Sequence, residues 1–281
     1  MAGVLDCGGR GLDLSCPQVM GILNVTPDSF SDGGRFVGAD AAIDHARSMV
    51  ADGAAVIDVG GESTRPGSKG ISVDEELDRV IPVLEALRNA VPVPLSVDTS
   101  KPEVMEAAAA AGAGLINDVM ALRRPGALEA ARSTGLPVCL MHMQGVPETM
   151  QDDPRYDSVV TEIRGFLAGR MADAEAAGIP RERIILDPGF GFGKTDPHNA
   201  RLLAGLPEIC NLGVPVLAGL SRKSLVGRVL GRALADRLAG SVAAAAIATW
   251  NGARIIRAHD VAETVDAVRL AEYVQAGGIE A

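Results

Sequence analysis

The stretch VPLSVDTSKPEVMEA (residues 93–107) contains the structural unit from which the fold can be predicted. A short apolar run over 93–97 ends at Asp98, and Ser100 with Glu103 then forms a capping box, a pattern typical of a helix start. A buried strand followed at once by a helix is the repeating unit of α/β proteins. The stretch therefore predicts a strand, a polar junction and a helix, in that order.

This unit recurs along the whole chain. Short apolar runs rich in β-branched residues alternate with helical patterns, and the predicted strands are 19–23, 54–59, 93–97, 114–116, 136–141, 183–186, 214–218 and 254–256. The runs are continuous rather than alternating, as expected for parallel strands buried on both faces. Eight such units in about 250 residues favour a closed (β/α)8 TIM barrel. The alternative is an open doubly wound sheet with an extra lobe, but no glycine fingerprint follows the first strand.

Several helices between these strands have recognisable ends. One helix is expected to end at Gly53, and Ser72 with Glu75 forms a second capping box. Pro82 lies inside the helix that this box begins, and is expected to bend or shorten it. Further helices are predicted over 156–177, 198–211, 237–250 and 261–275.

Composition excludes several classes of protein. The 281 residues are 47% hydrophobic and 22% charged, which is typical of a soluble globular chain rather than a disordered one. Aromatic residues make up only 3%, and the net charge is −10, so nucleic-acid binding is not expected. The four cysteines show no metal-type spacing, which favours a reducing compartment, the cytoplasm. The longest Ala/Val/Ile stretch, 242–248, is too short to span a bilayer, so no membrane anchor is expected.

Polar residues follow nearly every predicted strand. In parallel barrels the loops after the strands carry the chemistry, so these residues should meet at one rim. They are Asn24, Asp58, Asp98, Asn117, His142, Asp187, the run Ser221-Arg222-Lys223, and the pair Arg257 and His259.

Two chemically different groups stand out in this rim. Asp98, Asn117, Asp187 and Lys223 combine carboxylates, an amide and an ammonium, which suits the edge of a flat polar heterocycle. Arg65, Arg257 and His259 form a cationic group that suits a phosphate or diphosphate. The rim therefore predicts a site in two parts, one for a neutral polar ring and one for an anion.

Simpler interpretations exist for single residues. Asp98 and Asn117 are equally well explained as caps of the helices that follow them. Asp58 is interpreted as a structural hydrogen-bonding residue. Phe30, an aromatic in a polar, glycine-bounded loop, favours a role facing the substrate or in a lid.

The segment GFGFGKT (189–195) ends like a phosphate-binding P-loop, but that motif needs four residues between its first glycine and Gly-Lys-Thr, and this segment has three. No nucleoside-triphosphate site is predicted from it. Its glycines favour close approach of the backbone to a ligand, or a mobile loop.

Taken together, these motifs resemble the dihydropteroate synthases, the sulfonamide-target enzymes of folate biosynthesis. The resemblance extends over nearly the whole chain, on MGILNVTPDSFSDGG (20–34), DVGGESTRPG (58–67), SVDTSKPEV (96–104), IND (116–118), LMHMQG (140–145), LDPGFGFGK (186–194), GLSRKS (219–224) and IIRAHDV (255–261). It implies one pterin-binding TIM-barrel domain over residues 1–281, with 1–16 as a variable N-terminal segment, and a homodimer.

The resemblance also implies a reaction. 4-Aminobenzoate would condense with 6-hydroxymethyl-7,8-dihydropterin diphosphate to give 7,8-dihydropteroate and diphosphate. Asn24 would bind a Mg2+ ion that bridges the diphosphate, with Arg65, Arg257 and His259 completing the anion site. Asp32 would stabilise the pterin-methyl cation that forms as diphosphate leaves.

By the same resemblance, the pterin ring would contact Asp98, Asn117, Asp187 and Lys223, with Thr64 near the diphosphate-bearing end. Two loops would close to build the 4-aminobenzoate site. Phe30 and Pro66 would pack on its ring, and Ser221 and Arg222 would flank its carboxylate. The residues expected to take part in catalysis are Asp32, Arg65, Lys223, Arg257 and His259.

Two related functions are the alternatives. The folate-binding domain of corrinoid-dependent methyltransferases has a similar barrel, but should lack a full diphosphate site, which Arg65, Arg257 and His259 supply here. A non-catalytic pterin-binding paralogue should have lost loop residues such as Phe30, Asp32 or Arg65, and all three are present.

Overall fold

The computed structural model describes residues 3–25, 35–65 and 67–278, and of residues 35–39 it describes the backbone alone. Phe30, Asp32 and Pro66, which the sequence placed in the two loops over the site, lie outside the described residues. Within the described part, no helix is long and apolar enough to cross a membrane.

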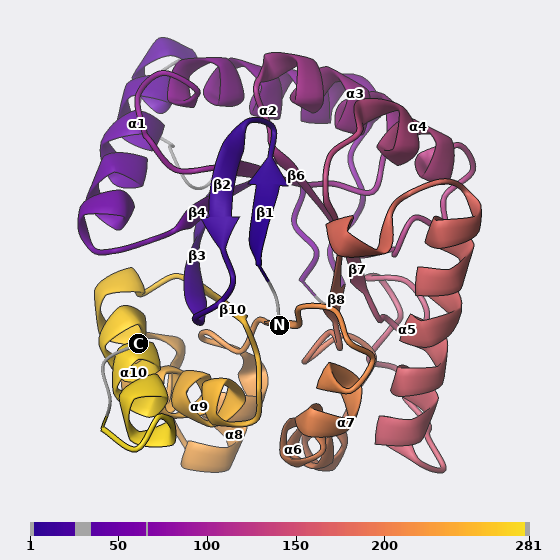
Figure 1. Ribbon diagram of the computed structural model, residues 1–281, viewed down its shortest axis with the longest axis vertical. Helices are drawn as coiled ribbons and strands as arrows, with labels where there is room; N and C mark the ends of the chain where they lie inside the picture. Colours follow the sequence, from indigo (N-terminus) through magenta and orange to yellow (C-terminus); the bar gives the residue numbers. More distant parts are fainter. Residues whose placement is uncertain (1–2, 26–34, 66, 279–281) are drawn as a thin grey trace.

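The described chain forms a barrel of eight parallel strands, which confirms the predicted (β/α)8 fold (Figure 1). The strands are β3 (Gln18–Asn24), β4 (Val56–Gly60), β5 (Leu95–Asp98), β6 (Leu115–Asp118), β7 (Val138–Met141), β8 (Ile184–Asp187), β9 (Leu217–Ala218) and β10 (Ile255–Ala258). They pair in the order β8-β7-β6-β5-β4-β3-β10-β9. A parallel bridge between Leu186 and Val216, with Leu186 N donating to Pro215 O at 3.0 Å, closes the ring between β8 and β9.

Every predicted strand is present, but most extend further toward the polar junctions than predicted. β5, β6 and β8 include Asp98, Asn117 and Asp187, because the backbone of these residues continues the ladder while their side chains reach the barrel mouth. The predicted strand 214–218 shrinks to Leu217–Ala218. Pro215 has no N–H to donate to a ladder, which is consistent with this late start.

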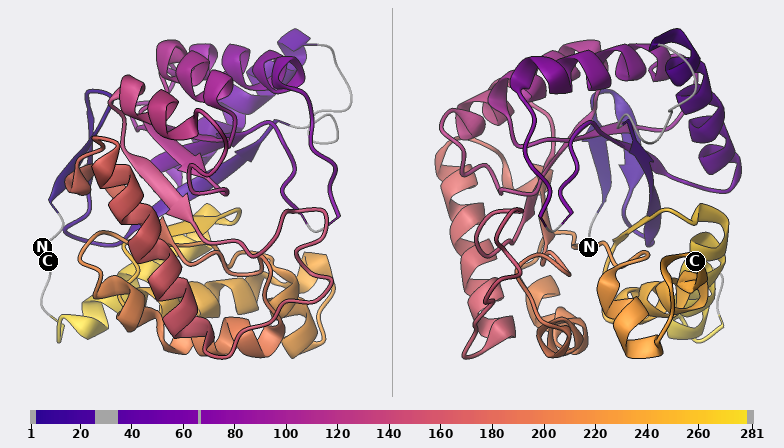
Figure 2. Two further views of the ribbon diagram at one scale, coloured as in Figure 1. Left: turned by 90° about the vertical axis from the view of Figure 1, so that its right-hand side faces the viewer. Right: turned by 180° about the vertical axis from the view of Figure 1, so that it is seen from behind.

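Helices surround the barrel (Figure 2). They are α1 (Arg35–Ala51), α2 (Val73–Leu87), α3 (Pro102–Ala111), α4 (Ala127–Thr134), α5 (Val159–Ala176), α6 (Asp196–Ala204), α7 (Leu206–Cys210), α8 (Ser224–Leu230), α9 (Leu238–Trp250) and α10 (Val261–Gln275), with short 3-10 turns at Arg181–Arg183 and Leu234–Asp236. The predicted helix 198–211 is two helices, α6 and α7, that meet at Gly205. α4 and α8 were not predicted.

The helix ends test the capping predictions. Ser72 caps α2 by accepting from Glu75 N at 3.2 Å, as predicted, while α2 runs through Pro82 to Leu87 and is not shortened. The box at Ser100 is wrong. α3 begins at Pro102 with Lys101 at the N-cap, because proline fixes the first helical position and keeps the residue before it extended.

The N-terminal segment, for which no structural role was predicted, forms a hairpin of β1 (Val4–Cys7) and β2 (Arg10–Asp13). Its residues Leu5, Cys7, Leu12 and Leu14 pack in one apolar cluster with Met20, Val56, Leu115, Ile185 and Ile255, which lie at the start of the barrel strands. At Gly114 a Cβ would lie 2.2 Å from Cys7 O, so only glycine fits beneath the hairpin. The hairpin therefore seals the end of the barrel opposite the polar rim (Figures 1 and 2).

Candidate active site

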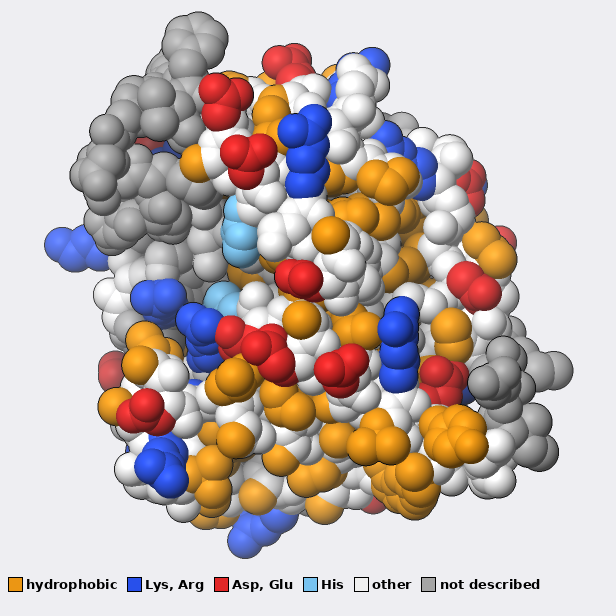
Figure 3. Space-filling view, turned by 90° about the vertical axis from the view of Figure 1, so that its left-hand side faces the viewer, with side chains coloured by type: hydrophobic (Ala, Val, Ile, Leu, Met, Phe, Trp, Pro, Cys, Tyr) orange, Lys and Arg blue, Asp and Glu red, His pale blue; other side chains and the backbone are white. Residues whose placement is uncertain are grey.

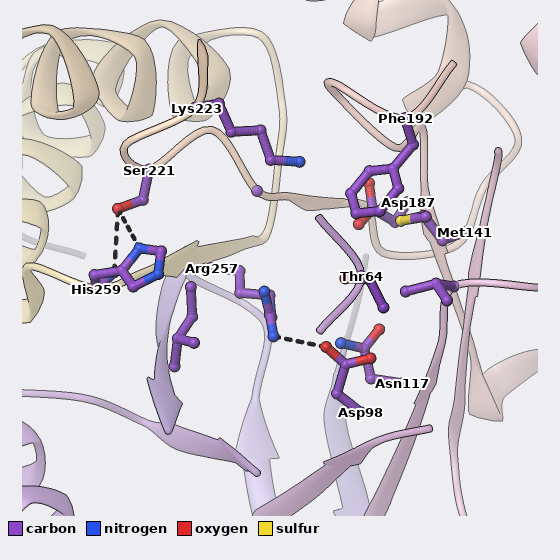
Figure 4. Close-up of a pocket in the computed structure, with 13 residues that line it drawn as sticks. Thr64, Asp98, Asn117, Met141, Asp187, Phe192, Ser221, Lys223, Arg257 and His259 are labelled. Atoms are coloured by element: carbon purple, nitrogen blue, oxygen red, sulfur yellow. Dashed lines mark hydrogen bonds and ion pairs between the residues drawn. The ribbon is translucent and has the colours of Figure 1, made fainter. Parts of the chain in front are cut away.

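A pocket of about 60 Å3 opens where the carboxyl ends of the strands meet (Figure 4). Its lining includes Asp98, Asn117, Asp187 and Lys223, the four residues predicted for a polar ring. Thr64, Ser221, Arg257 and His259 also line it. The structure thus brings these eight predicted residues together, while their roles stay predictions.

One wall of the pocket, which we call the paired wall, consists of Asp98, Asn117 and Arg257 in the lining and of Asp58 buried behind them. Arg257 donates from Nε to Asp58 Oδ2 at 2.6 Å and from Nη2 to Asp98 Oδ2 at 2.8 Å. Asn117 donates from Nδ2 to the same Asp58 oxygen at 3.1 Å. Asp58 is completely buried and holds both neighbours, which fits the structural role given to it from the sequence.

The opposite wall, which we call the open wall, consists of Asp187, Phe192 and Lys223. Asp187 accepts from Gly189 N at 2.7 Å, while Lys223 Nζ donates to Phe190 O and lies 4.5 Å from the centre of the Phe192 ring. Among the described residues no ion pair joins Asp187 to Lys223. A lysine ammonium has three N–H groups, so Lys223 keeps donors for a ligand.

Burial shifts the ionisation of the groups in both walls. It raises the pKa of Asp98 to about 7, against the opposing effect of Arg257. Burial also raises the pKa of Asp187, against Lys223, and lowers the pKa of Lys223 to about 8, against Asp187. Such shifts near neutral pH are typical of functional sites.

The predicted anion group is only partly assembled. Ser221 Oγ accepts from His259 N at 3.1 Å and lies 3.0 Å from His259 Nδ1. Burial, with Arg257, lowers the pKa of His259 to about 4, so this histidine is neutral near pH 7, not cationic as predicted. Arg65 is exposed and does not line the pocket, yet its charge is near enough to lower the pKa of His259 further.

Arg222, predicted to flank a substrate carboxylate, points away from the pocket. Its guanidinium pairs with Asp260, with Nε 2.9 Å from Oδ2. Its backbone has a φ of 56°, an uncommon conformation for a residue other than glycine. The strained turn places its neighbours Ser221 and Lys223 in the pocket lining while Arg222 itself faces outward.

Asn24 ends β3, beside Gly60 on β4. A Cβ on Gly60 would lie 3.8 Å from both Asn24 Oδ1 and Asp98 Oδ2, so an amide oxygen and a carboxylate oxygen face the same point above this glycine. Oxygen atoms of this kind are the ligands that Mg2+ prefers. Within the described part of the chain, no three His, Cys, Asp or Glu side chains gather as a metal site.

Sequence reasoning missed the apolar lining. Met141 ends β7 and Phe192 lies in the glycine-rich segment 189–193, and both face the pocket (Figure 4). The signal for Phe192 was present, since it is an aromatic that stands between Gly191 and Gly193.

A buried ion cluster beneath the β4–α2 loop was also missed. Lys101 Nζ donates to the carboxylates of Glu62 and Glu76, and burial raises the pKa of Glu76. Glu62 lies two residues before Thr64, so the cluster fastens the start of this loop to α2. A second cavity of about 320 Å3 above it shares Thr64 and Asp98 with the pocket.

A TIM barrel with carboxylate, amide and ammonium groups at its mouth, beside cationic and hydroxyl side chains, defines a barrel enzyme with a site for a polar ring next to an anion. Comparison with known proteins assigns the chain to one family within this class. Residues 20–259 match the model of the pterin binding enzyme family, and the chain belongs to that family.

Individual relatives agree with the family match. The chain is 56% identical to the dihydropteroate synthase of Escherichia coli (strain K12) over 264 residues, which are 94% of each chain. A structure of Xanthomonas albilineans dihydropteroate synthase with 4-aminobenzoic acid matches with a TM-score of 0.93 and 55% identity, over 98% of this chain and 99% of that one. Another, in complex with 7,8-dihydropteroate, matches with a TM-score of 0.89 and 53% identity, over 97% and 99%.

Proposed function

We propose that this chain is a dihydropteroate synthase, which condenses 4-aminobenzoate with 6-hydroxymethyl-7,8-dihydropterin diphosphate. The observation that carries the proposal is the gathering of Asp98, Asn117, Asp187 and Lys223 in one pocket, beside His259 and Ser221. Relatives at more than half identity with this name, one of them in complex with 7,8-dihydropteroate, support it.

The pocket suits a pterin ring on chemical grounds. The N–C–NH2 edge of a pterin offers parallel N–H donors, which a carboxylate such as Asp187 or Asp98 can accept in pairs. Lys223 and the Asn117 amide supply donors for the ring oxygen and nitrogens. Phe192 and Met141, which pack in one apolar cluster, provide apolar contact for the ring.

The reaction breaks the bond between the pterin methylene carbon and a diphosphate oxygen, and forms a bond from that carbon to the amine of 4-aminobenzoate. The amine loses one proton, and the electron pair of the broken bond leaves with diphosphate. The chain's task is to stabilise the negative charge that develops on diphosphate and the positive charge on the pterin methylene.

The residues near His259 suit the first task. The charge of Arg65 acts on His259 at the pocket. Arg257 donates from Nε to Asp58 and from Nη2 to Asp98, which leaves Nη1 as a donor for a ligand. The neutral His259 offers a hydrogen bond, and an anion beside it would favour its protonated form. Asp32, which lies outside the described residues, is proposed for the second task.

Mg2+ is part of the proposal, with Asn24 as its protein ligand. The amide oxygen of Asn24 above Gly60 fits this role, and a metal held mainly by phosphate oxygens and water needs no carboxylate cage. When bound, the ion would neutralise charge on the diphosphate.

A homodimer is also proposed. Large hydrophobic side chains are exposed on α8, α9, α10 and the turn before α9, namely Val229, Leu230, Leu234, Ile247, Trp250, Leu270, Tyr273 and Val274. Hydrophobic side chains gather over the lower part of the face in Figure 3. Exposed apolar surface of this extent is typical of a protein–protein interface. Light scattering after gel filtration should give twice the monomer mass, and Ile247→Glu should shift it toward the monomer.

The cytoplasm is the proposed location. All four cysteines are free, and Cys7 and Cys139 are buried, as expected for a chain that folds in a reducing compartment.

The test of the proposed activity is release of diphosphate from the pterin diphosphate with Mg2+, with and without 4-aminobenzoate, while dihydropteroate is followed by mass spectrometry. Release coupled to dihydropteroate establishes the synthase. Pterin binding without product, by folded protein with metal present, would instead identify a non-catalytic paralogue.

A further inference from the structure

The glycine-rich segment 189–193 has no phosphate-binding role in the sequence analysis, yet it forms much of the open wall. It follows β8 directly, places Phe192 in the pocket lining, and offers the carbonyl of Phe190 to Lys223. Its backbone has positive φ at Gly189, Gly191 and Gly193.

The segment packs closely against the loop after β7, which helps to hold its conformation. A Cβ at Gly189 would lie 1.9 Å from His142 O, and a Cβ at Gly193 would lie 2.7 Å from Gln144 O. The two loops therefore touch backbone to backbone, which only glycine permits. Such packing excludes larger residues from the glycine positions. It does not by itself determine the direction in which the carbonyl groups of the segment point.

Lys194 orients two of these carbonyl groups by donating hydrogen bonds to them. Its side chain is buried behind the segment, and its Nζ lies 2.8 Å from Gly189 O, 2.9 Å from Phe192 O and 3.0 Å from His142 Nδ1. An ammonium has three N–H groups, and these are its three nearest acceptors, with His142 O farther away at 3.4 Å. A histidine that accepts at Nδ1 is neutral and carries its proton on Nε2.

Burial shifts the pKa of both members of the pair. Burial, and next the charge of Lys194, lower the pKa of His142 to about 2, so His142 is neutral at any working pH. Burial also lowers the pKa of Lys194 well below its usual value, against Asp187, so the ammonium form is inferred from the hydrogen-bond geometry and not from the pKa. The ammonium form is the one that satisfies all three acceptors.

Two lysines thus hold opposite sides of one segment. Lys223 binds the Phe190 carbonyl from the pocket side, while Lys194 binds the carbonyls of Gly189 and Phe192 from behind. Lys194 does not line the pocket, so it acts through the segment rather than on a ligand.

We infer that Lys194, with neutral His142 as its partner, is a positioning residue that sets Phe192, Asp187 and the acceptor of Lys223 against the pterin ring. The inference rests on the proposed function, because the ring is the ligand that the open wall would contact. It predicts a defect specific to the pterin substrate.

The main test is Lys194→Met, which keeps the length of the side chain and removes the ammonium. We expect pterin diphosphate to bind roughly 10- to 100-fold more weakly, since small displacements of binding groups have effects of this size. The KM for 4-aminobenzoate should change by less than about threefold, because segment 189–193 is not proposed to contact that substrate. Calorimetry and steady-state kinetics at a temperature where the variant is folded give both values.

The matched control is Leu12→Ala in the hairpin at the far end of the barrel. It should lower the melting temperature while leaving pterin affinity unchanged. If Lys194→Met binds the pterin substrate as the wild type does, or weakens both substrates alike, Lys194 is merely structural and the inference is wrong. Failure of the wild type to bind the pterin substrate would instead contradict the proposed function.

A second pair of variants decides the matter if Lys194→Met does not fold. His142→Asn keeps an acceptor near the position of Nδ1, and His142→Leu removes it. We expect His142→Asn to retain most of the pterin affinity and His142→Leu to lose it, and equal affinities would overturn the inference. Nitrogen NMR of the wild type should show the His142 proton on Nε2, and a proton on Nδ1 would also overturn it.

Discussion

The two walls of the pocket hold their charges in different ways. In the paired wall, Arg257 bridges Asp58 and Asp98, and Asn117 joins the same network. In the open wall, Asp187 and Lys223 each bond to the backbone of the glycine-rich segment rather than to each other. In the first wall the two carboxylates therefore already share one guanidinium, while in the second wall the carboxylate and the ammonium are not paired with each other.

We therefore expect the paired wall to contribute mainly to the stability of the fold and the open wall mainly to binding of the ligand. Removing one partner of a buried ion pair leaves an unpaired charge in a medium of low dielectric, which destabilises the fold. Removing a group that is satisfied only by a carbonyl and an aromatic ring should affect chiefly the ligand that uses it. Variants in the two walls should show this division.

The largest effect is expected for Arg257→Ala in the paired wall. Asp58 and Asp98 would lose their common cation, and breaking a buried pair costs about 3–5 kcal/mol. The free energy of unfolding from urea titration should fall by this amount, together with activity. Arg222→Ala removes an exposed partner of Asp260 and should cost about 0–1 kcal/mol. A similar small loss for Arg257→Ala would show that the paired wall is not a stabilising network.

Lys223→Ala in the open wall should come next. We expect pterin diphosphate to bind roughly 100-fold more weakly, because carboxylates of the pocket lose their nearby cation and the ligand loses a charged donor. The melting temperature should fall less than for Arg257→Ala. Calorimetry that gives near-normal affinity would contradict this role for Lys223.

A smaller effect is expected from pH. The pKa of Asp98 is about 7 and that of Lys223 about 8, and the proposed binding of the ring uses the ionised form of each. Affinity for 6-hydroxymethylpterin, which lacks diphosphate, should fall below pH 7 as Asp98 gains a proton and fall above pH 8 as Lys223 loses one, by at most about tenfold per unit.

Asp98→Asn serves as the control for that profile. It should flatten the acid limb and leave the alkaline limb in place, after the ionisation of the free ligand has been subtracted. An acid limb that persists unchanged in Asp98→Asn would assign it to another group, such as Asp187, whose pKa is also raised.

The smallest effect is expected for Phe192→Leu. The variant keeps apolar contact with the ring but removes the aromatic face beneath Lys223 Nζ, an interaction worth about 0.5–1 kcal/mol. Pterin affinity measured by calorimetry should fall roughly two- to fivefold. A loss as large as that of Lys223→Ala would mean that the ring, rather than the ammonium, dominates the open wall.

The barrel and its rim were predictable because each strand repeats the same pattern, an apolar run that ends in a polar residue. Asp98, Asn117, Asp187 and Lys223 follow from that pattern, since parallel strands bring their carboxyl ends together. Contacts between distant loops follow no such local rule. The pairing of Arg222 with Asp260, which turns Arg222 away from the pocket, and the burial of Lys194 against His142 depend on how loops of different units pack.

Some of what was missed did have a local signal. The hairpin at the N-terminus reads VLDC, then Gly8-Gly9, then RGLD, which is an alternating strand pair about a glycine turn. The capping box at Ser100 fails for the opposite reason, because Pro102 overrides it by setting the first residue of α3. Local patterns were reliable where no neighbouring proline or tertiary contact competed with them.

The hairpin that seals the barrel also constrains how the chain is made. Its apolar residues pack against Ile255 of β10, and Gln18 N donates to Arg254 O just beside it, so this segment needs a strand that is synthesised much later. During synthesis the apolar face of the hairpin cannot pack completely until β10 has been added. Contacts of such long sequence separation form slowly. A chain that stops before β10 should therefore expose this apolar face and aggregate. Loss of only the residues after α10 should leave the packing of the hairpin on the barrel strands unchanged.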